Sequence, residues 1–372
     1  MKLHIVKREN CPLWKRALLY LAAVVIALLL GAALLNSLGV DPIAYYTRMF
    51  TMGTIGNRIA YKTYINYLKD FVPLVTVSIG LALAFKMRFW NIGGEGQFIL
   101  GSVAAATVAF KLGPSLSQGT TLLLMCVAAM ATAGLYGLLV AALKVKFGTN
   151  ETLLTLMLNY LALYFLIFLG DTKADWNFFL QEASERPVFE SFAEFAAFPA
   201  IPVDGRFSLN ICVIFTFIIG ALMFVYQKYT KHGYEIAVVG DSAGTAKYAG
   251  MKVSRIVLRT VFLSAALIGL AAAFKVGTSG VLSTSITDDV GWTGIIVAWL
   301  SQLSIPVIFI VSALICVLHT GSGAANMVYQ QVDSSFANIL QGLILFMVLA
   351  VDFFIRFKVV IVKKGGNGHA IG

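Results

Sequence analysis

A polar, glycine-rich stretch interrupts a very apolar part of the chain, FKMRFWNIGGEGQFILG (85–101). It brings the amides of Asn91 and Gln97 close to the carboxylate of Glu95. Polar groups in hydrocarbon cost free energy unless they face a cavity or a partner. The stretch therefore predicts polar residues beside a water-lined or protein-lined path. The alternative is a tight loop in which Glu95 caps the next helix.

Three of the four glycines in this stretch lie close together and affect its backbone. Each weakens a helix by roughly 1 kcal/mol and lets another backbone approach closely. Unpaired N–H and C=O groups at membrane depth are tolerated only where protein or a water-filled cavity satisfies them. We therefore expect a break or hinge formed by Gly93, Gly94 and Gly96.

A second polar stretch, GTNETLLTLMLNY (148–160), has the same character. Thr149 or Asn150 is the expected N-cap and Glu151 follows in the first turn, so capping explains these residues. Asn159 lies two turns further along nearly the same face, where capping does not explain it. It is predicted either to lie on the path or to hydrogen-bond a neighbouring helix.

Motifs for catalysis are missing from the sequence. It contains no phosphate-binding G-x-x-x-x-G-K-[ST], no H-E-x-x-H and no G-x-S-x-G. The four cysteines are widely spaced and form no C-x-x-C pair. We therefore expect no catalytic residue, no metal site and no cofactor bound by this chain.

The composition is that of an integral membrane protein. Hydrophobic residues make up 59% and charged residues 12%, with a mean hydropathy of +0.84, whereas a soluble chain is about a quarter charged. The candidate spans are 17–38, 71–85, 97–112, 120–143, 151–170, 209–226, 257–276, 290–302, 305–320 and 335–355. Several are shorter than the ~20 residues needed to cross, so their ends should extend into polar flanks; 290–302 is the weakest. The expected fold is an all-α polytopic membrane protein with about ten transmembrane helices.

Lys and Arg near the span ends predict the orientation. Most of the 28 lie on one side if the N-terminus is inside, which favours an N-in, C-in topology. This bias explains the net charge of +10, and no basic cluster with interleaved aromatics indicates nucleic acid. The expected organisation is a single transmembrane domain (1–372) with a first half (16–170), an extracytoplasmic loop (171–208), a second half (209–356) and a cytoplasmic tail (357–372).

The two longest loops differ in charge. The outer loop 171–208 is acidic and is either a solvated connector or a docking surface for an external protein. The inner loop 228–256 is basic and predicts a short helix with Asp241 or Ser242 as N-cap and Gly250 as its stop.

A weak internal similarity links the two halves. SIGLALAFKM (78–87) resembles LIGLAAAFKV (267–276). The first would run inward and the second outward, as an inverted repeat of five plus five helices requires.

Several ordered passages match one family. They are FWNIGGEGQFILG (89–101), TLMLNYLA (155–162), the passage beginning GYEIAVVGDSAGTAKYAG (233–272), GWTGIIVAWL (291–300) and QGLILFMVLA (341–350). Together they resemble the permease subunits of bacterial ABC importers of the branched-chain amino acid, ribose and nucleoside class. The NIGGEGQ form is most similar to the longer of the two permeases in nucleoside-type systems.

The resemblance implies ten helices in two inverted halves in the bacterial cytoplasmic (inner) membrane, with a second permease around one path. It also implies cytoplasmic ATPases, which use ATP and Mg²⁺, and an extracytoplasmic binding protein. The loop 240–251 would be a coupling helix seated on an ATPase. The implied coupling residues are Gly240, Asp241, Ala246, Lys247, Tyr248, Ala249 and Gly250.

The function implied by this resemblance is a non-catalytic permease subunit that passes a small polar solute. A nucleoside is the first choice, and riboflavin or a simple sugar is the alternative. Phe89, Trp90 and Trp292 would line a path for a flat base, although aromatic residues in membrane helices also serve in packing or at the interface.

Rival functions remain from other classes. A proton-coupled secondary transporter would use Glu95, Glu151 or His319 as its proton site and would need no ATPase. An intramembrane enzyme lacks a credible nucleophile and base. A scaffold without transport predicts that substitutions of Asn91, Glu95 and Asn159 leave uptake unchanged.

Overall fold

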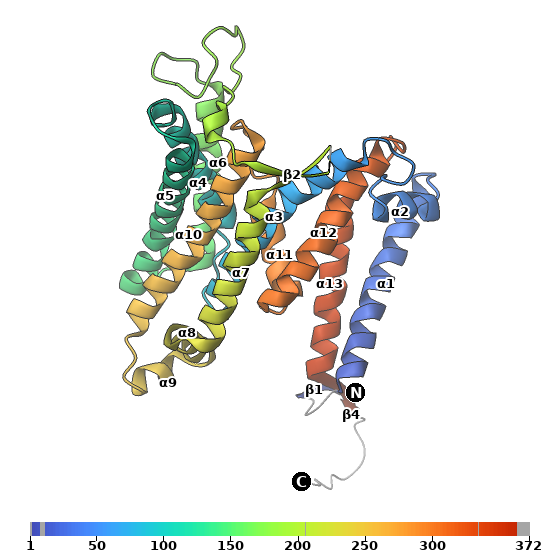
Figure 1. Ribbon diagram of the computed structural model, residues 1–372. Coiled ribbons are helices and arrows are strands. Elements are labelled where there is room, and N and C mark those ends of the chain that lie inside the picture. Colours follow the sequence, from blue (N-terminus) through green and yellow to red (C-terminus); the bar gives the residue numbers. More distant parts are fainter. Residues whose placement is uncertain (1, 8–11, 205, 334, 363–372) are drawn as a thin grey trace. The chain divides into compact units, whose positions relative to one another are not determined.

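The computed structural model of the chain describes residues 2–7, 12–204, 206–333 and 335–362, and these residues are mostly helical (Figure 1). The helices are α1 (Leu13–Ser37), α2 (Pro42–Phe50), α3 (Ala60–Lys86), α4 (Gly94–Lys111), α5 (Gln118–Phe147), α6 (Glu151–Asp171), α7 (Ile211–Tyr229), α8 (Lys231–Asp241), α9 (Ala243–Tyr248), α10 (Val253–Ser279), α11 (Val290–Leu300), α12 (Ile305–Asn326) and α13 (Phe336–Arg356). Two antiparallel ribbons pair β1 (Lys2–Lys7) with β4 (Phe357–Val362) and β2 (Ala200–Asp204) with β3 (Phe207–Asn210).

Each of the ten predicted apolar segments coincides with a helix. In the described parts of the chain, seven helices are long and apolar enough to cross a membrane, namely α1, α3, α5, α6, α7, α10 and α12. The helix α11 has only 11 residues, so it is about 16 Å long against a hydrocarbon core of about 30 Å. The segment 290–302 therefore does not extend into its flanks as expected. The number of crossings, their orientation and the repeat stay predictions.

The helix α3 shows why hydropathy alone places span ends poorly. It begins at Ala60, well before the predicted start at residue 71, and includes Asp70. The carboxylate of Asp70 pairs with the ammonium of Lys275 on α10 at 2.7 Å. Hydropathy ends the apolar segment before Asp70, because a charge in a span is unfavourable unless it is paired. The partner, Lys275, lies far away in sequence, so hydropathy does not detect the pairing.

The chain divides into two compact units, and the division falls within α12. The first unit comprises residues 1–55 and 317–372. In it Tyr45 is fully buried, and its hydroxyl hydrogen-bonds the hydroxyl of Ser322 and the side-chain oxygen of Asn326, both at 2.9 Å. The predicted tail 357–372 begins as β4, while its residues 363–372, and Arg8 at the other end, lie outside the described residues.

The second unit, residues 56–316, is organised around α10, which packs on α3, α4 and α5. Close approach depends on small residues: a Cβ on Gly80 of α3 would lie 2.7 Å from the Ser264 carbonyl oxygen, and one on Gly269 would lie 2.2 Å from the Ala129 carbonyl oxygen. Gly80 lies beside Ser264, and Asp70 pairs with Lys275. The helices α3 and α10 therefore run antiparallel, as the similarity between 78–87 and 267–276 requires.

The two long loops lie at opposite ends of this unit (Figure 1). The loop 171–208 has its own packing, because Phe110 of α4 contacts the rings of Phe178, Phe179 and Phe192. Part of the loop is thus packed against α4, and both predictions for it, a solvated connector and a docking surface, stay predictions. The loop 228–256 forms α8 and α9 instead of one short helix.

Candidate functional site

The predicted polar stretch forms a break between two helices. The helix α3 ends at Lys86, and α4 begins at Gly94. The glycines act by allowing close approach: a Cβ on Gly96 would lie 3.0 Å from the Cα of Asn159, and Gly94 lies against the Cα of Gly291. A hinge at these glycines stays a prediction.

Two amides stabilise the break from inside it. The side chains of Asn91 and Gln97 exchange a pair of hydrogen bonds of 3.1 and 3.0 Å. The Asn91 side-chain oxygen also accepts from the backbone N–H of Gly93. Asn91 is fully buried and Gln97 is 1% exposed, so the pair satisfies polar groups that would otherwise be costly to bury.

Asn159 joins the break to α6. Its side-chain oxygen accepts from the backbone N–H of Gly96 at 2.8 Å, and its amide donates to the carbonyl of Ile92 at 2.9 Å. The second of the two predictions for Asn159, a bond between neighbouring helices, is confirmed. Asn150 is the N-cap of α6, as predicted.

Glu95 joins the start of α4 to the start of α11. Its carboxylate accepts from the backbone N–H of Gly291 at 2.9 Å. An anionic side chain near a helix N-terminus is stabilised by the unpaired N–H groups there. Glu95 therefore does cap a helix, but that helix is α11 and not the helix that carries it.

The predicted aromatic residues differ in exposure. Phe89 is buried, whereas Trp90 and Trp292 are 45% and 37% exposed. Trp90 stacks on Trp299 with ring centroids 5.3 Å apart, and Phe85 contacts both rings. The sequence analysis missed Trp299, although it lies two turns after Trp292 on one face of α11.

The predicted coupling residues occupy the end of α8, the second half of α9 and the turn that follows it. Ser242 caps α9 by accepting from the N–H of Thr245 at 3.2 Å, so of the two predicted caps Ser242 is right and Asp241, the last residue of α8, is wrong. Gly250 ends the turn with φ +75°, a conformation that favours glycine. The exposed members are Asp241, Lys247, Tyr248, Ala249 and Gly250, and the buried ones are Gly240 and Ala246.

Tyr248 is the most prominent side chain of this loop, at 96% exposed, while Ala246 beneath it is fully buried. One face of α9 thus anchors it to the unit and the other projects away. An aromatic ring left so exposed outside the spans is available to a partner.

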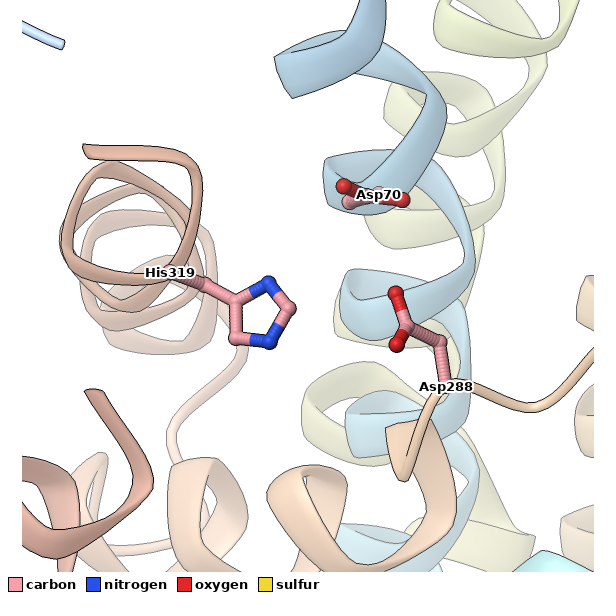
Figure 2. A group of neighbouring side chains, drawn as sticks. All are labelled: Asp70, Asp288 and His319. Atoms are coloured by element: carbon pink, nitrogen blue, oxygen red, sulfur yellow. The ribbon is translucent and has the colours of Figure 1, made fainter. Parts of the chain in front are cut away.

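Two carboxylates near the other end of α3 were not predicted as a group. Asp70 on α3 and Asp288 before α11 have oxygen atoms within 4.8 Å of each other, and both side chains are labelled in Figure 2. Lys275 pairs with Asp70, and Asp288 and Asp289 both have positive φ. His319, also labelled in Figure 2, belongs to the other unit. We assign a bracing role to the Asp70–Lys275 pair.

Comparisons with known proteins agree on one family. Residues 63–349 match the family described as branched-chain amino acid transport system / permease component. The chain is 26% identical to the nucleoside ABC transporter permease protein NupB of Lactococcus lactis, over 92% of this chain and 93% of that protein. It is 28% identical to the guanosine ABC transporter permease protein NupP of Bacillus subtilis, over 93% and 96% of the two chains.

A third relative has a different printed solute. The glucose ABC transporter permease protein TsgB13 of Haloferax volcanii is 25% identical over all of this chain and 97% of its own length. No solved structure is a significant match. The family and the apolar helices confirm a multi-pass permease of the cytoplasmic membrane. The chain therefore belongs to the permease-component family of branched-chain amino acid transport systems.

Proposed function

We propose that this chain forms part of the translocation path of an ATP-binding-cassette importer for nucleosides. Two relatives that match over nearly their whole length are named for nucleoside and guanosine transport. The observation that carries the proposal is the meeting of two helix N-termini, those of α4 and α11, at the buried carboxylate of Glu95. Helices that begin inside a membrane bundle are typical of solute pathways.

The polar residues of the site then have separate roles. Asn91, Gln97 and Asn159 use their amides within the protein, so we assign them to holding the break between α3 and α4. Trp90 and Trp292 keep exposed ring surface, which suits stacking on a flat base.

The side chain of Phe89 is only 2% exposed, so it would pack behind the residues that line the path. Glu95 fixes the start of α11 through Gly291. It thereby also positions Trp292, the next residue of that helix.

The partners follow from the same proposal. An extracytoplasmic binding protein would approach from the side of loop 171–208. It would release the solute to this chain and a second permease. On the opposite, cytoplasmic side, the exposed face of α9 with Tyr248 would dock on an ATPase that binds ATP and Mg²⁺. The expected N-in, C-in orientation would put the loop 228–256 on that side.

Uptake by the assembled importer tests the solute class. Proteoliposomes containing this chain, its second permease, its ATPase and its binding protein would be offered radiolabelled uridine, adenosine, guanosine, riboflavin and glucose. We expect saturable, ATP-dependent uptake of at least one nucleoside. Uptake of glucose alone would support the second candidate, a sugar importer, which the relative named for glucose favours.

The energy source separates this proposal from the rival of another class. Uptake that persists without ATP, follows an imposed proton gradient and needs no ATPase would overturn the proposal in favour of a proton-coupled transporter.

A further inference from the structure

Three contacts hold α8 to neighbouring helices, and one of these helices, α3, ends where the polar break begins. We propose that α8 is a clamp: the ion pair between Glu235 of α8 and Arg259 of α10, with the close contact of Gly240 on the end of α3, transmits movement of α9 to the break at residues 87–93. This inference rests on the proposed docking of α9 on an ATPase.

The ion pair is the contact with α10. The guanidinium of Arg259 donates to the carboxylate of Glu235 at 3.0 Å and also to Nδ1 of His232. The Glu235 side chain is 15% exposed and that of Arg259 is 35% exposed. A charge-assisted hydrogen bond is stronger than one between neutral groups. It fixes α8 to the helix around which the second unit is organised.

The contact with α3 is made through backbone. A Cβ on Gly240 would lie 2.1 Å from the carbonyl oxygen of Lys86 and 3.3 Å from the Cα of Met87. Lys86 is the last residue of α3, so α8 touches the chain where the break begins. At the other end of α8, a Cβ on Gly233 would lie 2.2 Å from the carbonyl oxygen of Gln227 on α7.

The arrangement leaves α8 little freedom to move alone. It follows α7 after a single residue, Thr230, whose side chain caps it by accepting from the N–H of Gly233. It precedes α9 by a single residue, Ser242. A displacement of α9 must therefore either break these contacts or carry the ends of α3 and α10 with it. Packed contacts are stiff, so α9 should carry the two helix ends with it. The end of α3 would then move the break that Asn91, Gln97 and Asn159 hold.

Charge reversal tests the clamp in the complete importer. The variants Glu235→Arg, Arg259→Glu and the double swap would each be purified with the second permease and the ATPase. The measurements are ATPase retention, ATP hydrolysis without solute, and uptake of the panel solute that the wild-type importer carries. We expect each single reversal to keep the ATPase and its basal hydrolysis while the solute moved per ATP falls by about tenfold.

The double swap should restore that ratio to within about threefold of wild type, which a merely destabilising substitution would not do. The matched control is Asp70→Asn, which breaks the ion pair between α3 and α10 without touching α8; it should leave the ratio unchanged. If a reversal fails to assemble, Glu235→Gln and Arg259→Lys replace it, with a smaller loss expected for Arg259→Lys because it retains the charge.

A fluorescence measurement that requires no solute complements the uptake assay. A bimane label on Trp90→Cys, in a background without the four native cysteines, would report the break when ATP is trapped with vanadate. The spectral change on trapping should appear with the native pair and disappear in Glu235→Arg.

The clamp is overturned if Glu235→Arg and Arg259→Glu keep both the wild-type ratio and the spectral change. It is also overturned if both lose transport and the double swap fails to recover it. If the ATPase binds equally well when Tyr248 is removed, the proposed docking fails instead, and the two results are therefore distinguishable.

Discussion

The carboxylate of Glu95 on α4 accepts a hydrogen bond from the backbone N–H of Gly291, 196 residues later in the chain, at 2.9 Å. This contact makes one anionic side chain responsible for the first turn of a helix on which it does not lie. It thereby ties the position of α11 to the break between α3 and α4.

Replacing this carboxylate tests its role in transport. Glu95→Gln keeps an acceptor but removes the charge, and Glu95→Ala removes both. A lost capping interaction costs about 0.5–2 kcal/mol, so Glu95→Ala should lower the thermal unfolding midpoint more than Glu95→Gln. Both should reduce ATP-dependent uptake, measured in proteoliposomes. Normal uptake by both variants would remove Glu95 from the path.

Asn159 provides a test of the buried polar network. Asn159→Leu leaves the N–H of Gly96 and the carbonyl of Ile92 without their partner, at a cost of about 1–3 kcal/mol for each group. Thermal unfolding in detergent should show a clear loss of stability. Tyr160→Phe, at the adjacent and exposed position, is the control. Equal unfolding midpoints for the two variants would contradict the role of Asn159 in holding the break between α3 and α4.

Tyr248 separates docking from folding. Because its side chain is 96% exposed, Tyr248→Ala should leave the unfolding midpoint within error and yet weaken co-purification of the ATPase. Tyr229→Ala, which removes another exposed tyrosine outside α9, should retain the ATPase. Full retention by the Tyr248 variant would show that this face of α9 is not the docking surface.

Gly250 tests the stop of α9. Its φ of +75° disfavours any residue with a Cβ by about 1 kcal/mol, although open space surrounds it. Gly250→Ala should therefore cost little stability but alter the loop, and Gly250→Trp should also obstruct docking. Coupled ATP hydrolysis that matches wild type in Gly250→Trp would rule out the loop 240–251 as the ATPase contact.

The ion pair of α8 gives the protein a pH dependence. Partial desolvation raises the pKa of Glu235, but hydrogen bonds and charge from Arg259, with a further contribution from His232, outweigh it, so the pKa lies below its usual value. The unfolded chain then binds the proton at higher pH than the folded one. The stabilisation is complete above the usual glutamate pKa of about 4.3 and is lost as the pH falls through the folded value.

Thermal unfolding as a function of pH checks this dependence. The difference in midpoint between wild type and Glu235→Gln should be constant near neutral pH and shrink under acid conditions. A difference that grows as the pH falls would show that the sign is wrong.

The sequence by itself located ten of the helices, though not all of their ends. Each of the ten apolar segments became one, because burial of apolar side chains and satisfaction of backbone groups both favour helix in a membrane. Local rules also narrowed each of two caps to a pair of adjacent residues, which included Asn150 and Ser242, and identified Gly250 as a stop. These features depend on residues within one turn of each other, so the sequence contains all the information they require.

The tertiary structure alone decided what the polar residues contact. The bonds of Glu95 to Gly291, of Asn159 to Gly96, and of Asp70 to Lys275 join residues far apart in the chain. No periodicity specifies such a pair, because each depends on how close small residues let two helices pack. For the same reason the early start of α3, the 11-residue length of α11 and the stacking of Trp90 on Trp299 appeared only in the folded chain.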